Sequence, residues 1–100
     1  MIARLWEGEV PAQKGPRYLE YMREIALRDY AATPGNRGAW CLHRSGEEAV
    51  KIVMFTLWDD LDSIRAFAGD DPTVARYYDF DPDYLLEMTP RAVHFDVMAP

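Results

Sequence analysis

The sequence predicts a small α+β protein whose four antiparallel strands and two helices follow the order β-α-β-β-α-β. This is a ferredoxin-like arrangement with both helices on one face of the sheet. Three observations carry the prediction. Residues 50–69 combine a largely apolar strand pattern with an amphipathic helix that follows at once. A second helical pattern occupies 12–32, and three further strand patterns flank these two units. At 100 residues the chain is expected to form one domain, 1–100.

The first strand and the first helix are separated by Pro11. Residues 1–10 alternate, so that Ala3 and Leu5 share one face while Arg4 and Trp6 share the other. The helix predicted over 12–32 tolerates Pro16 only near its start. Its apolar stripe has helical spacing and consists of Tyr18, Leu19, Met22, Ile25, Ala26 and Tyr30.

The remaining strands and the second helix follow from turn and capping signals. Strands over 37–45 and 49–58 are separated by a short turn at Gly46 and therefore form a hairpin. Asp59 or Asp60 caps a helix that ends at Gly69. The last strand is expected over 89–98.

Residues 70–88 form a long connection that is both aromatic and acidic. Connections of this length are often lids or binding loops. The structural alternative is a short helix over 83–88 that packs Leu85 and Leu86 against the edge of the core. Pro72 could also begin a single helical turn that includes Val74 and Tyr77.

The strand over 50–58 predicts an assembly of two chains. Both of its faces are apolar, whereas a strand with one wet face should alternate apolar and polar residues. The helices can cover only one face of the sheet. The other face is expected to hold Trp6, Trp58, Met54 and Met98 or their neighbours, and a homodimer through this open sheet face would bury it.

Charge and composition exclude several kinds of partner and cofactor. The formal net charge is −6, and the acidic excess lies in the second half of the chain, so neither nucleic acid nor a membrane surface is expected to bind. No leader or long apolar run is present, which predicts a soluble cytoplasmic protein. The single cysteine, Cys41, cannot form an internal disulfide. Two scattered histidines predict no metal site.

Three residues are candidates for chemistry. His94 titrates near neutral pH and shares a strand face with Asp96, so it is a candidate base, although a packed histidine is the structural alternative. Trp58 ends a strand where a helix begins, and its indole N–H could donate to a substrate oxygen or to a backbone carbonyl. Arg4 could hold an anionic substrate or pair with an acid across the sheet.

An apolar pocket beneath the 70–88 loop is the candidate binding site for a small aromatic ligand. The alternative is that the same side chains simply form the core. The expected substrate-binding residues come from the two helices, the third strand and the loop, and are Tyr18, Met22, Met54, Phe67, Tyr77 and Tyr78.

Several segments together resemble the antibiotic biosynthesis monooxygenase family, whose members are dimeric α+β barrels. The resemblance covers nearly the whole chain and rests on the segments ARLWEGEVP, TPGNRGAW, FTLWDDLDSIRAFAG, ARYY and VHFDV. The family includes cofactor-free quinol monooxygenases, haem-degrading enzymes and proteins of no known activity. Trp58 matches the family's strand-end tryptophan, whereas Met54 stands where the quinol oxygenases have asparagine. The haem-degrading branch has an asparagine in the first strand and a histidine on the second helix, and neither is present here.

The resemblance implies a cofactor-independent, monooxygenase-like protein that acts on a small aromatic or quinol-type substrate. His94 would be the base, and Trp58 and Arg4 would contact the oxyanion. The alternative is a non-catalytic dimeric protein of the same fold that binds a small ligand or acts in stress. Haem degradation is the weakest of these expectations.

Overall fold

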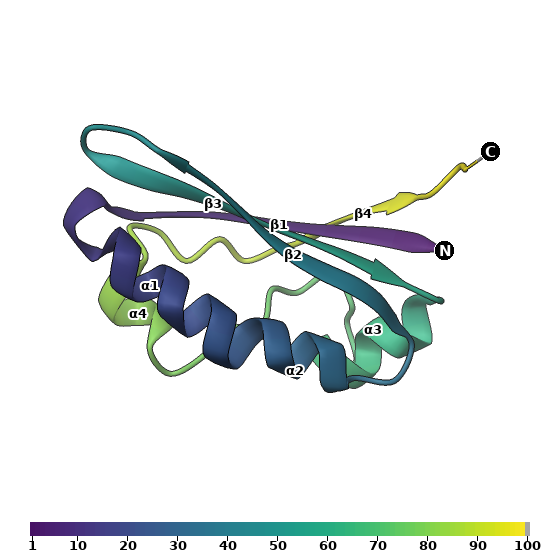
Figure 1. Ribbon diagram of the computed structural model, residues 1–100. Helices are drawn as coiled ribbons and strands as arrows, with labels where there is room; N and C mark the ends of the chain where they lie inside the picture. Colours follow the sequence, from purple (N-terminus) through teal and green to yellow (C-terminus); the bar gives the residue numbers. More distant parts are fainter. Residues whose placement is uncertain (100) are drawn as a thin grey trace.

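A computed structural model describes residues 1–99 and contains one four-stranded antiparallel sheet with helices on one face (Figure 1). Along the sheet the order is β2 (Asn36–Ser45), β3 (Ala49–Trp58), β1 (Ile2–Pro11) and β4 (Val93–Asp96). β1 and β3 are therefore the two central strands, and their side chains can pack against the helices on one face of the sheet. The sequence predicted this α+β architecture with a four-stranded antiparallel sheet.

The register of the sheet decides which side chains face the helices. Arg4 of β1 lies opposite Thr56 of β3 and opposite His94 of β4. Trp6 lies opposite Met54. Because side chains alternate along a strand, the even-numbered residues of β1 and β3 point together into the helical layer. Most of them are buried there.

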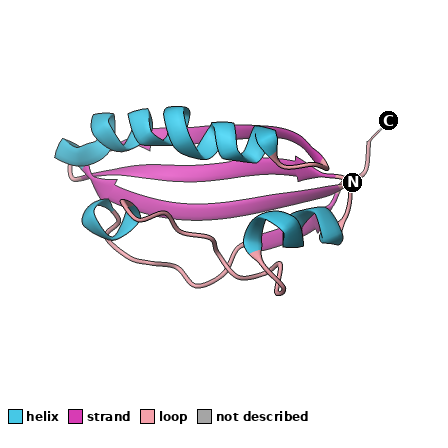
Figure 2. Cartoon of the chain, turned by 90° about the horizontal axis from the view of Figure 1, so that it is seen from below, coloured by secondary structure: helices cyan, strands magenta, loops and turns pink. Residues whose placement is uncertain are grey.

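One long helical segment runs along the sheet on the side of β2 (Figure 2). It begins with a 3₁₀ turn, η1 (Ala12–Lys14), continues as α1 (Gly15–Tyr21) and ends as α2 (Leu27–Ala32). Between α1 and α2 lies a π-helical turn, η2 (Met22–Ala26). The helix predicted over 12–32 is therefore present, with Pro16 in its first turn, but its wider middle turn was not predicted.

The second helix, α3 (Leu61–Ala68), begins at Asp60, whose side chain accepts a 2.8 Å hydrogen bond from the backbone N–H of Ser63. It ends at Gly69, where φ is 105°, a backbone conformation that favours glycine. No helix within residues 1–99 is both long enough and apolar enough to cross a membrane.

Residues 70–92, which we call the roof segment, run beneath the sheet beside the long helix and contain only a short helix, α4 (Asp81–Tyr84) (Figure 2). The helix predicted over 83–88 begins earlier, because Pro82 favours the first turn of a helix, and it ends before Leu85. Leu85 is buried as predicted, whereas Leu86 is 59% exposed. The turn predicted to begin at Pro72 is not a helix.

The strand predicted over 89–98 is shorter, since only Val93–Asp96 pair with β1. The preceding residues, 90–92, pair with residues 73–75 instead. Ala92 donates its backbone N–H to Thr73, and the backbone N–H of Ala75 donates to Pro90. These bonds use the backbone groups that a longer β4 would need for the sheet.

The prediction for the open sheet face was wrong in its named tryptophans. Trp6, Met54 and Trp58 are 6%, 3% and 0% exposed. They lie on the same face of the sheet as the buried Ile52, which is the face that meets the helices. Met98 is exposed but lies beyond β4. The side of the sheet opposite the helices, which we call the open face, carries neighbouring apolar residues from all four strands, namely Leu5, Trp40, Leu42, Val53, Phe55, Leu57, Val93 and Phe95.

Candidate functional site

An interior pocket lies between the long helix, the sheet and the roof segment. The space open to the centre of a water-sized sphere is about 20 Å³, which is room for about one water molecule. Both ends of the π-helical turn, Met22 and Ala26, face it. The pocket is lined by Arg4, Trp6, Tyr18, Met22, Ala26, Tyr30, Met54, Arg76, Tyr78 and Asp81. Five predicted site residues, Arg4, Tyr18, Met22, Met54 and Tyr78, therefore lie together.

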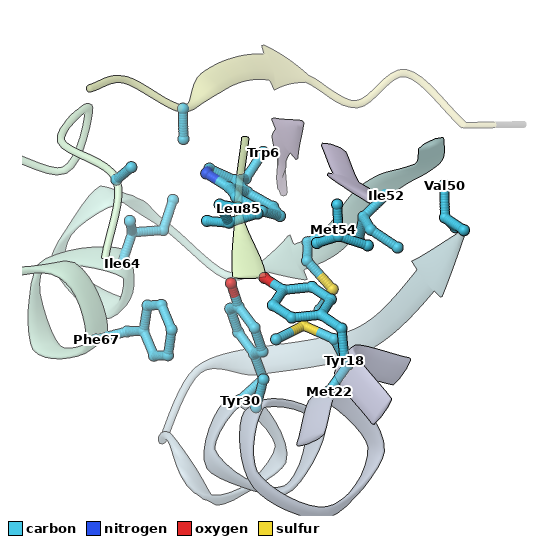
Figure 3. Close-up of a cluster of buried hydrophobic side chains, with 14 of the residues drawn as sticks. Trp6, Tyr18, Met22, Tyr30, Val50, Ile52, Met54, Ile64, Phe67 and Leu85 are labelled. Carbon is cyan, nitrogen blue, oxygen red and sulfur yellow. The ribbon is translucent and has the colours of Figure 1, made fainter. Parts of the chain in front are cut away.

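The side chains of the long helix rise from it toward the sheet (Figure 3). The hydroxyl groups of Tyr18 and Tyr30 point away from the helix axis. Met22 and Met54 line the same pocket as these two tyrosines. Each of these four side chains is at most 5% exposed. Aromatic rings, thioethers and a few oriented polar groups are the usual lining of a site for a small organic molecule.

A buried tyrosine–aspartate pair closes one end of the pocket. The hydroxyl of Tyr18 donates to Oδ1 of Asp81 over 2.8 Å, and the backbone N–H of Tyr78 donates to Oδ2 over 2.7 Å. Burial raises the pKa of Asp81 from its ordinary value, although these two donors oppose the shift. Burial and the neighbouring carboxylate also raise the pKa of Tyr18. Asp81 is thus an unusually basic carboxylate inside the protein.

Arg4 supplies a cation on the sheet side of the pocket. Its side chain is 2% exposed, and Nη2 donates to the carbonyl oxygen of Val74 over 2.9 Å. Its Nε is buried and has no hydrogen-bond partner within residues 1–99. Burial lowers the pKa of Arg4, and the adjacent hydroxyl of Tyr30 opposes this effect. The guanidinium also lies 5.8 Å from the ring centroid of Phe67.

The roof segment is attached to the long helix through Asp29. One oxygen of its carboxylate, Oδ2, accepts a 2.7 Å hydrogen bond from the hydroxyl of Tyr78 and lies 2.9 Å from Nη1 of Arg76. The guanidinium of Arg76 also stacks over the ring of Phe67, 4.5 Å from its centroid. Asp29 therefore holds two roof residues that line the pocket, and it does so at a site that is only partly buried.

Three predicted site residues lie behind the pocket wall. Trp58 is fully buried, and its indole Nε1 donates to Oγ1 of Thr56 over 2.8 Å, so this N–H is already used inside the protein. Phe67 stacks on Tyr30 with ring centroids 4.2 Å apart. Tyr77 accepts a 3.2 Å hydrogen bond from Nε1 of Trp6. These residues fix the positions of the lining side chains.

His94 faces a different cleft, and Arg4 is not among the residues that line it. In this cleft, the space open to the centre of a water-sized sphere is about 280 Å³. Leu61 and Thr73 also line it. Burial and the charge of Arg4 lower the pKa of His94, while Asp71 opposes them. Asp96, the predicted partner of His94, is exposed and makes no hydrogen bond with it. The structure therefore separates His94 from the aromatic pocket.

Several lining residues were not predicted from the sequence. Trp6 was assigned to the open face, and Tyr30 was treated only as part of a helical stripe. Arg76 and Asp81 lie in the roof segment, where no periodic pattern indicates which side chains turn inward. The one available signal for Asp81 is that it precedes Pro82 at the start of α4.

No group of three or more histidine, cysteine, aspartate or glutamate side chains within the described residues could hold a metal ion. In comparisons with known proteins, no protein-family model matches the chain and no curated protein gives a match. The site is therefore interpreted from its own geometry.

Proposed function

We propose that this protein is a homodimer of ferredoxin-like subunits that binds a small aromatic molecule in the interior pocket. The observation that carries the proposal is the lining itself. The pocket is lined by two tyrosines and two methionines, Tyr18, Tyr30, Met22 and Met54. A buried cation, Arg4, also lines it. Rings and thioethers favour a flat apolar ligand, and a few fixed polar groups orient it.

Ligand entry requires the roof segment to move, because the closed pocket has room for about one water molecule. The roof is suited to such a motion. It contains little regular structure, and its polar contacts with the long helix are few, chiefly those of Asp29 and Asp81. Its other contacts with that helix include those between rings, with Phe80 and Tyr84 against Tyr18 and Tyr21. Lids of this kind commonly open on the microsecond-to-millisecond timescale.

The second subunit is proposed to cover the open face. Trp40, Leu42, Val93 and Phe95 are 47%, 51%, 54% and 54% exposed there, on strands that lie at both edges of the sheet. An apolar area that spans four strands is typical of a protein–protein interface. Two copies related by a two-fold axis would bury the same residues on both subunits, as in the dimeric α+β barrels that the sequence resembles.

A second candidate function is cofactor-independent oxygenation, and the burial of the Asp81 carboxylate favours it. An activated CH₂ group of an anthrone-type substrate would give a proton to Asp81. The resulting carbanion would transfer an electron to O₂, and the two radicals would combine into a peroxide that regains the proton. Loss of water then leaves a carbonyl, so that R₂CH₂ and O₂ become R₂C=O and H₂O. A buried carboxylate of raised pKa is suited to the first step.

One experiment separates the two functions. The protein is mixed with a panel of dihydroquinones, anthrones and simple aromatic acids, and both the melting temperature and the O₂ uptake are measured. Binding without turnover predicts a raised melting temperature with O₂ uptake equal to that of the protein-free control. Oxygenation predicts additional O₂ uptake that Asp81→Asn abolishes. Asp83→Asn, an exposed carboxylate on the same short helix, is the matched control.

The proposal fails if no member of the panel raises the melting temperature and none is turned over. It also fails if ligands bind equally well to a variant whose pocket is filled, such as Ala26→Leu, because the binding site then lies elsewhere on the molecule.

A further inference from the structure

Arg4 is a buried cation without an anionic partner. The ion pairs within residues 1–99 involve Arg17, Arg37, Lys51, Arg65, Arg76 and Arg91, and none of them includes Arg4. A buried charge that lacks a counter-charge is costly, so arginines at such depth are normally paired. At 2% exposure, the side chain of Arg4 is removed from the bulk water that would hydrate it at the surface.

The acids closest to the pocket are already engaged with other groups. Asp81 accepts from the Tyr18 hydroxyl and from the backbone N–H of Tyr78. Asp29 accepts from Tyr78 and pairs with Arg76. The protein thus supplies several donors around the pocket but leaves no carboxylate free for Arg4.

A second unsatisfied nitrogen lies beside the first. Nε2 of His94 is buried without a hydrogen-bond partner, and His94 is the residue directly opposite Arg4 across β1 and β4. Within the described residues, Arg4 Nε and His94 Nε2 are the buried side-chain nitrogens that lack partners. This strand pair therefore holds two buried nitrogens without partners, and one of them belongs to the cationic guanidinium of Arg4.

One nitrogen of the Arg4 guanidinium has a hydrogen-bond partner, and another has none. Nη2 is held by the carbonyl of Val74, and the plane of the group lies near the ring of Phe67. Nε remains the unsatisfied donor. Carboxylate and phenolate oxygens are the acceptors that a guanidinium binds most strongly, because such hydrogen bonds are charge-assisted.

We infer that Arg4 is an anion-recognition residue, and that the ligand of the interior pocket is an aromatic carboxylate or phenolate whose negative oxygen accepts from Arg4 Nε. This inference rests on the proposed function, since it names the chemical class of the ligand for the same pocket. The aromatic and thioether lining holds the ring, and Arg4 provides the charge that the pocket otherwise lacks. The competing account is that a single water molecule satisfies Arg4 Nε.

The test compares charged and neutral ligands of equal shape. Protein labelled with ¹⁵N is titrated with benzoate and with 4-nitrophenolate, and then with their neutral counterparts benzamide and 4-nitroanisole. The signals followed are those of the arginine Nε–H groups. We expect each anion that binds to do so at least about tenfold more tightly than its neutral counterpart. We also expect the Arg4 Nε–H signal to shift on binding of the anion.

Arg4→Gln should remove the preference for the anion, while Arg17→Gln, at an exposed arginine of the long helix, should leave it unchanged. Because Arg4→Gln could also impair folding, a second readout uses the unmodified protein. A bound anion offsets the charge of Arg4, which together with burial holds the pKa of His94 low against the opposing effect of Asp71. The pKa of His94 should therefore rise when the anion binds.

Equal affinity for anions and neutral counterparts, with no shift of the Arg4 signal, would overturn the inference while leaving the aromatic pocket in place. Preferential binding of anions that shifts surface arginines but not Arg4 would also overturn it. If no ligand of either class binds, the inference and the proposed function both fail.

Discussion

The hydroxyl of Tyr18 lies 2.8 Å from Oδ1 of Asp81, and this hydrogen bond joins the long helix to the short helix of the roof segment. The two residues are 63 positions apart in the sequence, and both are at most 2% exposed. The bond therefore contributes to the closed form of the pocket, and it opposes the rise in the pKa of Asp81 that burial causes.

Replacing Tyr18 by phenylalanine should lower the free energy of unfolding by about 1–3 kcal/mol, because Asp81 would remain buried with one donor fewer. Urea denaturation measures the change. Tyr84→Phe, at a partly exposed position of the same short helix, is the control and should stay within about 0.5 kcal/mol of the parent protein. An equal loss of unfolding free energy in both variants would contradict a specific contribution of the Tyr18–Asp81 hydrogen bond to stability.

Asp29 should control access to the pocket. Asp29→Ala removes the acceptor for the Tyr78 hydroxyl and the partner of Arg76, so the roof segment should open more often. Hydrogen exchange of backbone amides in 70–92 should become faster, and a ligand should associate more rapidly. Asp62→Ala breaks an exposed ion pair with Arg65 and serves as control. Unchanged exchange in the Asp29 variant would contradict a role as an attachment of the roof.

His94 should make the folded state sensitive to mild acid. Its pKa in the folded protein lies below the ordinary value of 6.5, chiefly because of burial and then because of Arg4. As the pH falls below about 6.5, the unfolded chain takes up a proton that the folded chain resists, so the free energy of unfolding falls. His94→Gln should flatten this pH dependence, whereas His43→Gln, at an exposed position, should not. Identical pH profiles for the parent and the His94 variant would contradict this account.

The open face should mediate dimerisation. Phe95→Glu places a charge in the middle of the apolar residues of β1 and β4, and it should convert a dimer to a monomer in sedimentation experiments at micromolar concentration. Glu24→Lys changes an exposed residue of the helical face and should leave the dimer intact. A parent protein that sediments as a monomer would remove the basis for the proposed assembly.

The sheet and the two main helices could be predicted because each depends on local signals. Alternation along 1–10, the largely apolar run over 49–58, the turn at Gly46 and the cap at Asp60 all act within a few residues. The error about Trp6 and Trp58 concerned which of two apolar strand faces meets the helices. Both faces of β3 are apolar, so periodicity alone does not distinguish them.

The pocket itself was only partly predictable. Tyr18 and Met22 belong to a helical stripe that periodicity identifies, but the π-helical turn at Met22–Ala26 leaves no periodic trace in the sequence. Arg76 and Asp81 reach the pocket through contacts between distant segments, such as Tyr18 with Asp81. The closed volume also depends on side-chain packing, which no sequence pattern reports.

The most direct test of the aromatic pocket uses the methyl groups of methionine. Of the five methionines, Met22 and Met54 line the pocket, whereas Met1, Met88 and Met98 are 59%, 40% and 98% exposed. In a ¹³C-methyl NMR titration with an aromatic ligand, the signals of Met22 and Met54 should shift together as the ring enters, while the three exposed methionines stay in place. Saturable binding that moves only the exposed methionines would contradict the account.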